Sequence, residues 1–361
     1  MLTRRTLIHA SAAMWAGAAA ARVPGGDPPA TLAAAWDDSA GRHHVGVLEV
    51  VQPAGAAASR LRVRHALPVP TRAHAVTPLP DGSIVAVARR PGAWLLRWRP
   101  GSAAPARWQW SEPDRSFNGH VLVDGDRALL CTETDTSDGS GLLVRRDAVT
   151  LAVTDEWPTG GIDSHAVLAL PEGGWLVANG GVPVVPESGR LKGDRAAMDS
   201  SLVRLNTAGE IQGTWRLADR RLSLRHLAQH DSGAVGVAMQ AEHDNDAERR
   251  LAPLLALWDG QRLLSGSSEA LEGYAGDIVA RPSGFLVGAT RAACVAQFNL
   301  QGQCVVRHPL PQACALAPWS AQGWLAGGAP AGRISRDPGL STRDLHASGL
   351  RVDNHWVCID T

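Results

Sequence analysis

Lysine is almost absent from this sequence of 361 residues, and Lys192 is the only one. Arginine therefore carries nearly all of the positive charge, and the 35 Lys and Arg residues balance 35 Asp and Glu residues to a formal net charge of zero. Binding to nucleic acid or to an anionic membrane surface requires a basic patch. The charge balance gives no support to either kind of partner.

Several signatures of catalysis and of helical folds are also missing. The sequence has no GxSxG nucleophile motif, no Walker loop and no GxGxxG that leads into a helix, which argues against the enzymes and nucleotide-binding proteins built on them. After Ala21, no segment keeps an apolar period of 3.6 residues over ten residues, so a helical fold is excluded.

Cysteine is scarce and carries no metal-binding spacing. The five cysteines include no CxxC pair. A disulfide between Cys294 and Cys304, or between Cys304 and Cys314, is open, because sequence does not settle connectivity. Cys131 and Cys358 fall inside apolar strand patterns, so we expect buried free thiols there.

The first residues have the composition of a targeting segment. Residues 3–8 (TRRTLI) resemble a twin-arginine export motif, and an alanine-rich apolar run follows to Ala21. We therefore predict a signal peptide over residues 1–21, with an uncleaved N-terminal helix as the alternative, and a flexible leader over 22–30. The apolar run is too short for a membrane span. This predicts a periplasmic protein without a membrane span after cleavage, consisting of one domain over residues 31–361.

Glycine and proline, by contrast, are abundant, and they mark the turns of a repeated unit. They total 61 residues, which suits many short strands joined by turns. Units of strand, tight turn and strand begin at His74, His120, His165 and His226, then at Gly276 and near Cys314. The intervals are 46, 45, 61, 50 and about 38 residues, and a period of ~40–50 residues with four short strands is typical of propeller blades.

The two ends of the chain complete the pattern. A single strand follows His355, and residues 31–69 hold three strands without an initial one. The sequence therefore predicts an all-β fold, a seven-bladed β-propeller closed by pairing the C-terminal strand with N-terminal strands. Such closure removes exposed sheet edges.

Polar residues recur at fixed places in this repeat. In a blade, the start of the first strand and the end of the second lie on the same face, which pairs a histidine with a second polar residue 13–15 positions later. The pairs are His74 with Arg89, His120 with Glu133, His165 with Asn179 and His226 with Gln240; His355 is grouped with Asp37 and Asp38, and the fifth unit offers Asp277 with Thr290 and Arg291.

Neutral imidazole is a common ligand of zinc, copper and iron, and carboxylates add oxygen donors. We therefore predict a metal site formed by His74, His120, His165, His226, His355 and Glu133. Arg89, Asn179, Gln240 and Asp37 are the predicted ligand-binding residues, and Glu133 is the candidate general base. The alternative is a purely structural ring, in which a Gly119-His120 pair only forms hydrogen bonds within its blade.

The other polar residues and segments are explained as well or better without a binding role. The acidic segments 135–140 and 242–246 are expected to be solvated turns rather than calcium sites. Seven further histidines are expected to be surface or fold residues: His43, His44, His65, His230, His243, His308 and His346. The insertion Val182 to Ser200 follows a second strand, so it belongs to the same face as the histidines. It suits either a lid over a site or a loop packed on a neighbouring blade.

Several short motifs, taken together, are similar to one bacterial family. They are 117–120 (FNGH), 132–135 (TETD), 160–165 (GGIDSH), 177–181 (VANGG), 222–226 (LSLRH) and 353–355 (DNH). The members of that family are uncharacterised exported propellers, often encoded beside imelysin-type iron-uptake proteins and a di-haem peroxidase-like protein. Where this chain has Asp163-Ser164-His165, the family usually has Gly-Pro-His.

The resemblance implies the propeller fold and a link to periplasmic iron handling, with no established activity. More distantly, the histidine ring resembles copper- or haem-carrying propellers of respiratory enzymes, in architecture only. Our first hypothesis is a monomeric periplasmic propeller that binds iron, copper or a metal-bearing ligand at a histidine-ringed channel mouth and serves metal acquisition. The alternatives are an oxidoreductase or hydrolase that uses the same face, and a scaffold for iron-uptake proteins.

Overall fold

The computed structural model describes residues 30–51, 58–184, 193–319, 323–328, 331–335, 342–347 and 349–359. The predicted signal peptide and nearly all of the predicted leader lie outside these ranges. The described residues are almost entirely strands, with one short α-helix, α1 (Asp246–Leu251), and one 3₁₀ helix, η2 (Arg195–Ala197). Among them, we find no helix long and apolar enough to span a membrane.

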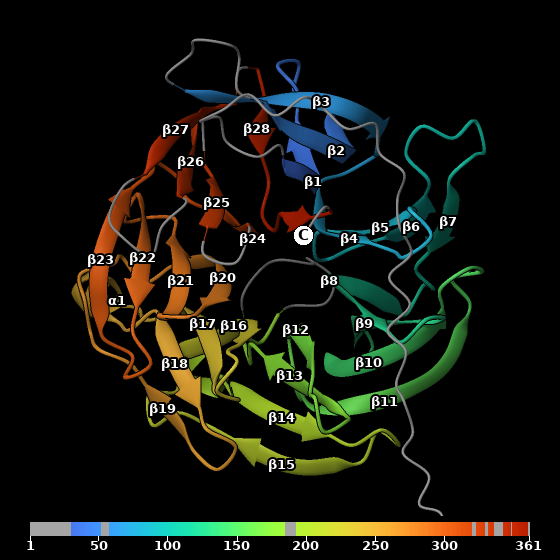
Figure 1. The fold of residues 1–361 in the computed structure, drawn as a ribbon. Coiled ribbons are helices and arrows are strands. Elements are labelled where there is room, and N and C mark those ends of the chain that lie inside the picture. Colours follow the sequence, from blue (N-terminus) through green and yellow to red (C-terminus); the bar gives the residue numbers. More distant parts are fainter. Residues whose placement is uncertain are drawn as a thin grey trace, which may run out of the picture.

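Five sheets each contain four antiparallel strands that follow one another along the chain. Each is a meander whose first strand lies innermost, and the sheets stand around a common centre (Figure 1). The first is β4 (Ala73–Pro78), β5 (Ile84–Ala88), β6 (Trp94–Trp98), β7 (Arg107–Trp110); the second is β8 (Arg115–Asp124), β9 (Ala128–Asp135), β10 (Ser140–Asp147), β11 (Val153–Ile162); the third is β12 (Ser164–Ala169), β13 (Trp175–Asn179), β14 (Ser201–Leu205), β15 (Ile211–Trp215). The fourth is β16 (Leu222–Gln229), β17 (Val235–Ala241), β18 (Leu255–Trp258), β19 (Leu263–Ser265), and the fifth is β20 (Ala275–Arg281), β21 (Gly284–Ala289), β22 (Cys294–Phe298), β23 (Cys304–Pro309).

The sixth sheet combines the two ends of the chain. It has nine strands in the order β24-β25-β26-β27-β3-β2-β1-β28, and β29 also pairs with β1. These strands are β24 (Ala315–Trp319), β25 (Gly323–Gly327), β26 (Ala331–Ser335), β27 (Arg343–His346), β1 (Ala30–Asp37), β2 (His43–Val51), β3 (Ser59–Pro68), β28 (Arg351–Val352) and β29 (Val357–Cys358).

The prediction of an all-β propeller is therefore confirmed, but the number of separate sheets is six and not seven. The difference arises at the outer edge, where β27 pairs in parallel with β3 at Leu345–Ser59 and His346–Arg60. This short pairing joins strands that the repeat pattern assigned to two blades. A parallel contact between strands far apart in sequence leaves no local signal, so the spacing of the repeats did not predict it.

The predicted closure of the ring is confirmed by the pairing of β1. Val352 and Arg351 of β28 lie opposite Trp36 and Asp37. Farther along β1, Cys358 and Val357 of β29 lie opposite Leu32 and Ala33. Strands from the two ends of the chain thus lie side by side in one sheet (Figure 1).

The structure decides the open question of the disulfides, and it differs from the expectation for Cys358, which is partly exposed whereas Cys131 is buried. All five cysteines are free thiols. In the β22–β23 pair, Cys304 lies opposite Phe298, and Cys294 lies opposite Pro309, so the pairing does not place these two thiols opposite each other. In the acidic segment 242–246 the solvated turn leads into a helix, because Asn245 Oδ1 accepts hydrogen bonds from the first turn of α1.

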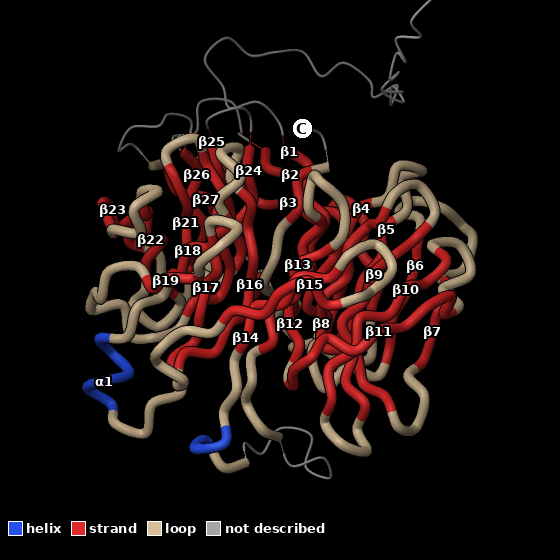
Figure 2. Tube along the Cα trace, turned by 90° about the horizontal axis from the view of Figure 1, so that it is seen from below, coloured by secondary structure: helices blue, strands red, loops and turns tan. Residues whose placement is uncertain are grey.

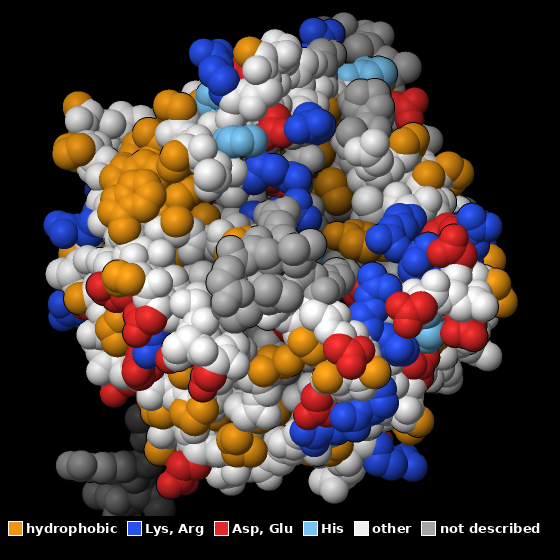
Figure 3. Space-filling model, turned by 180° about the vertical axis from the view of Figure 1, so that it is seen from behind, with side chains coloured by type: hydrophobic (Ala, Val, Ile, Leu, Met, Phe, Trp, Pro, Cys, Tyr) orange, Lys and Arg blue, Asp and Glu red, His pale blue; other side chains and the backbone are white. Residues whose placement is uncertain are grey.

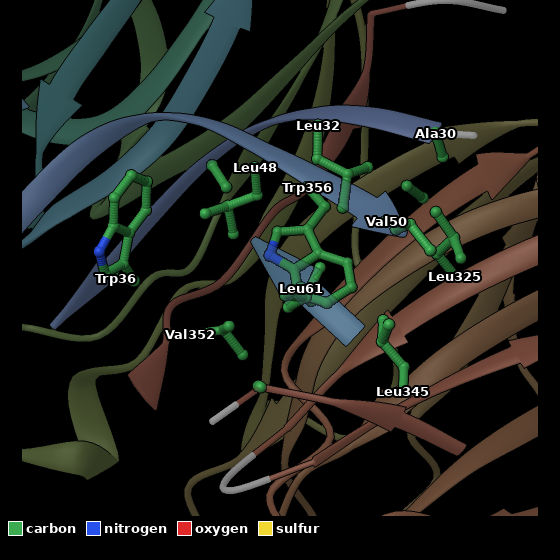
Figure 4. Packing of buried hydrophobic residues seen from close by; sticks show 14 of the residues in the cluster. Ala30, Leu32, Trp36, Leu48, Val50, Leu61, Leu325, Leu345, Val352 and Trp356 are labelled. Carbon is green, nitrogen blue, oxygen red and sulfur yellow. The ribbon is translucent and has the colours of Figure 1, made fainter. Parts of the chain in front are cut away.

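Apolar side chains fill the space between neighbouring sheets. One cluster joins the two ends of the chain, and it includes Trp36, Leu48, Leu325, Leu345 and Trp356 (Figure 4). The Trp356 ring lies against Gly327, where a Cβ atom would overlap it. The C-terminal segment is therefore held by burial of a large aromatic ring as well as by strand pairing.

We expect Trp356→Ala to lower the free energy of unfolding by about 3–5 kcal/mol, because it leaves a cavity at the closure. Trp110→Ala is the matched control, since Trp110 is 54% exposed whereas Trp356 is 3% exposed. Urea denaturation followed by tryptophan fluorescence measures both. Equal losses in the two variants would contradict the role of Trp356.

Candidate functional site

The inner strands of the five four-stranded sheets share an irregularity near their start. The antiparallel register shifts between Ala73 and Val76, Phe117 and Val121, Ser164 and Val167, Leu224 and His226, and Ala275 and Ile278. Each shift contains or adjoins one polar residue from the repeat: His74, His120, His165, His226 or Asp277. A β-bulge turns side chains away from the regular alternation, and such bulges occur next to functional sites.

The closing strand has its own interruption at the matching place. His355 lies between β28 and β29, and its φ of 61° is in the left-handed region. Non-glycine residues adopt this conformation at some cost and mostly where surrounding structure enforces it. The break between β28 and β29 thus takes the side chain of His355 out of the regular strand alternation, as the bulges do for the other histidines.

The five imidazoles pack into one compact cluster, in which the centroids of four pairs of non-consecutive rings also lie 5.1–6.0 Å apart. Ring centroids are separated by 4.9 Å for His74–His120 and 4.4 Å for His120–His165. The next separations are 4.9 Å for His165–His226, 4.6 Å for His226–His355 and 4.6 Å for His355–His74. One ligand atom from each of His74, His120, His226 and His355 lies within 4.8 Å of the others. We call these five residues the histidine centre.

Asp277 orients one member of the histidine centre. His355 Nδ1 lies 2.8 Å from Asp277 Oδ1, and the backbone N–H of Leu316 donates to Asp277 Oδ2 at 2.8 Å. A carboxylate partner holds the proton on Nδ1 and leaves an unshared electron pair on Nε2. That Nε2 lies 3.3 Å from Nε2 of His74, so the lone pair of His355 is directed at the centre.

Burial keeps the other imidazoles neutral. It lowers the pKa of His74, His120, His165 and His226 well below 6.5, and neighbouring histidines lower it further. In the described part of the chain, one nitrogen of each of these four rings is buried without a hydrogen-bond partner. An unsatisfied buried polar atom costs about 1–3 kcal/mol, and a bound ion could supply the missing partner, since the ligand atoms of four members of the histidine centre lie close enough to hold one.

Two arginines and one carboxylate lie beside the histidine centre. Arg90 and Arg225 both contact Asp163, with Arg225 Nη1 at 2.8 Å from Asp163 Oδ2. Arg225 is fully buried, and burial lowers its pKa to about 10. The two guanidinium groups also help to lower the pKa of His120, His165 and His226. In the bacterial family that the sequence resembles, the position of Asp163 is usually glycine. The φ of Asp163 is 56°.

Gly119 has a packing role in the centre. Its φ is 94°, and a Cβ atom built on it would lie 2.7 Å from Cδ2 of His74. A side chain at this position would push His74 out of the ring. The Gly119-His120 pair therefore joins two neighbouring sheets at the centre and is not confined to its own blade.

Glu133 does not join the histidines. Its carboxylate accepts hydrogen bonds from Arg146 Nε at 3.1 Å and Nη2 at 2.7 Å, and both side chains are buried. The Arg146 guanidinium lies over the Phe117 ring. In the β8–β9 register, Glu133 lies opposite Phe117, before the bulge that carries His120. Its carboxylate therefore forms a buried ion pair instead of joining the predicted metal site.

The Asn179 amide is occupied by contacts to the neighbouring second sheet and to its own sheet. Its Oδ1 accepts a hydrogen bond from Thr159 Oγ1 at 2.8 Å, and its Nδ2 donates to Thr159 O and Ser201 Oγ. These contacts satisfy a fully buried amide. The structure therefore does not place Asn179 at a ligand pocket.

The other predicted ligand-binding residues do line pockets. Asp37 and Arg89 line one of about 240 Å³, although Asp37 is also paired with Arg351 and with His43. Gln240 lines a pocket of about 110 Å³ and donates to Ala275 O at 3.3 Å. Tyr274, the single tyrosine of the chain, lines both pockets, so the two adjoin each other.

The insertion lies on the same face as these pockets. Val182, Pro183 and Val184 line a pocket of about 330 Å³, and Arg195 in η2 lines the one that contains Gln240. Helices η2 and α1 both lie at one end of the sheets (Figure 2), and Figure 3 shows this face with arginine side chains near its centre. The middle of the predicted lid, residues 185–192, lies outside the described residues.

The remaining histidines have local roles. His44 stacks on Trp36, His243 contacts Asp219, and His230 contacts Ser232.

The sequence patterns did not single out Arg90 and Arg225 as site residues, and Asp163 stood out only as a departure from a motif. The available signal was the position of these arginines, because Arg90 lies two residues after the apolar strand β5 and Arg225 lies within β16.

Comparisons with known proteins agree on fold and leave activity open. Against solved structures, the chain is similar to a functionally unknown protein from Desulfotomaculum acetoxidans, with a TM-score of 0.55, 11% identity, and coverage of 91% of this chain and 98% of that one. It is also similar to hydrazine synthase from Kuenenia stuttgartiensis, with a TM-score of 0.54, 10% identity, and coverage of 87% and 94%. At this identity the likeness shows the fold alone.

No curated protein matches the chain. A family model does match, over residues 67–359, and those residues include all five members of the histidine centre. The chain therefore belongs to the family described as "Protein of unknown function (DUF1513)".

Proposed function

We propose that this protein binds a transition metal, iron or copper, at the histidine centre. The observation that carries the proposal is the approach of one ligand atom from each of four histidines to within 4.8 Å of one another. The four come from inner strands far apart in sequence, so their convergence is a property of the whole ring. His165, the fifth member, has a buried Nδ1 without a partner in the described chain and is available as a further ligand.

The donor set fits such an ion. Imidazole nitrogens suit copper, iron and zinc, and metal–nitrogen bonds of about 2.0–2.1 Å place tetrahedral ligands about 3.3 Å apart. The 3.3 Å between His74 Nε2 and His355 Nε2 matches that spacing. The widest separation of 4.8 Å exceeds it, so the rings would contract slightly around an ion.

The wider functional hypothesis follows from the sequence. We propose that the protein is exported by the twin-arginine route, works as a monomer in the periplasm and serves iron or copper acquisition beside iron-uptake proteins.

We also propose that the nine-stranded sheet acts as two blades joined at β27–β3, which gives the propeller seven blades. The alternative of an enzyme with Glu133 as base loses support, because Arg146 already pairs with that carboxylate. The scaffold alternative stays a prediction.

We expect His226→Ala to reduce bound copper or iron at least tenfold, because it removes one ligand from the centre. His346→Ala is the control, since His346 is exposed on β27. Metal-stripped protein is titrated with copper(II) sulfate or ferrous sulfate, and the bound ion is measured by atomic absorption after desalting. Equal metal content in both variants and in the parent would reject the site.

Asp277→Asn tests the orientation of His355. We expect a loss of metal affinity of about 10–100-fold, because the amide no longer holds the proton on Nδ1 of His355. The matched control is Asp231→Asn, since Asp231 is exposed in a turn. Isothermal titration with copper(II) measures both, and circular dichroism checks folding. An unchanged dissociation constant in a folded Asp277→Asn variant would contradict this role.

The metal-stripped protein should lose stability below pH 6.5. The folded pKa values of His74, His120, His165 and His226 lie well below 6.5. The unfolded chain therefore binds more protons than the folded chain below that pH, and the free energy of unfolding falls by up to about 1.4 kcal/mol per pH unit for each ring. Urea midpoints at pH 7.5, 6.5 and 5.5 measure the slope.

His226→Gln is the matched variant for this pH series, because it removes one of the four titrating groups. Its stability should fall less steeply with decreasing pH than that of the parent. A midpoint that stays constant from pH 7.5 to 5.5 in the parent would contradict the burial of neutral imidazoles.

A further inference from the structure

A pocket of about 330 Å³ lies directly beside the histidine centre. Its lining includes Asn118 and Asp163, each two residues before a histidine of the centre. Arg89 and Arg90 line it as well, and both are close enough to lower the pKa of members of the centre. A ligand in this pocket would therefore lie next to a metal held by the imidazoles.

Arg89 differs from the other arginines around it. Arg90 is paired with Asp163, Arg72 with Asp353, and Arg351 with Asp37. For the side chain of Arg89, we find no hydrogen bond and no ion pair among the residues that the structure describes. It lines both the 330 Å³ pocket and the adjoining 240 Å³ pocket. A half-buried guanidinium with free donors at the junction of two pockets is suited to bind an oxyanion.

The rest of the lining narrows the kind of anion. Ile162, Val182 and Pro183 form an apolar wall that can cover a carbon skeleton. Ser116, Thr134 and Thr136 add hydroxyl groups, which pair with carboxylates or with a ligand hydroxyl. Asp138 and Asp163 also line the pocket, and the Asp163 carboxylate is already paired with Arg90 and Arg225. Inorganic phosphate has no carbon skeleton to lie against the apolar wall.

We propose that this pocket binds a small hydroxycarboxylate, with one carboxylate on Arg89 and the carbon chain against the Ile162–Val182 wall. The pocket volume of about 330 Å³ is at the lower end of small-molecule sites, about 300–1,000 Å³, which favours a small metabolite over a peptide. Hydroxycarboxylates chelate iron and copper through oxygen donors. The inference rests on the proposed function in one respect: the ligand presents a chelated metal to the histidine centre.

Citrate is the probe, and metal-stripped protein is titrated with it in a calorimeter. We expect citrate to bind the parent and to bind Arg89→Met at least tenfold more weakly, because the carboxylate loses its cationic partner. Arg89→Lys should lie between the two, since it keeps the charge without the planar fork. Arg107→Met is the control, as Arg107 is exposed on the outer strand β7, and it should bind citrate as the parent does.

The outcomes separate this inference from the proposed metal site. Absence of citrate binding to the parent, or equal binding to a folded Arg89→Met variant, would overturn it. Inorganic phosphate that binds as tightly as citrate would overturn the assignment to carboxylates. Copper(II) sulfate titrated into the same preparations reports the histidine centre separately. Citrate binding without copper binding would reject the metal proposal and leave the anion pocket standing.

Discussion

The bulge near the start of each inner strand is the local feature on which the site depends. In a regular antiparallel pair, side chains alternate between the two faces of a sheet, and both faces of these inner strands are buried against neighbouring sheets. The register shifts at His74, His165 and His226 each insert one extra residue in the inner strand, and the shift at His120 inserts two, which releases these side chains from that alternation. The ring then brings the released side chains together, and His355 reaches the same place through the break between β28 and β29.

This arrangement concentrates buried polar groups that would be costly in an ordinary core. Four imidazoles are held neutral by burial, and each leaves a nitrogen without a partner in the described chain. Arg90 and Arg225 lie beside them and are balanced by Asp163. Buried groups of this kind lower stability unless something completes their contacts. A metal at the imidazoles and an anion at Arg89 are the two additions that would complete them.

Closure of the ring connects fold and site. The C-terminal segment packs Trp356 into the apolar cluster that joins the two ends of the chain, and it pairs with β1 on both sides of His355. The residue that completes the histidine centre is thus held in place by the same contacts that join the ends of the chain. Asp277 on β20 then orients its ring through Nδ1. Stability at the closure and geometry at the centre are therefore coupled.

The sequence by itself determined the propeller class, the closure by the C-terminal strand and the five histidines that share one position of the repeat. These follow from alternation, turn residues and spacing, which are local and periodic properties of a chain. Only the tertiary structure decided that β27 joins β3, that Glu133 pairs with Arg146, and that Asn179 bonds to Thr159 of the neighbouring sheet. It also decided the roles of Asp163, Arg225 and Asp277. Such contacts depend on which side chains of distant strands face one another across a buried space, and a one-residue bulge changes that facing without changing the repeat.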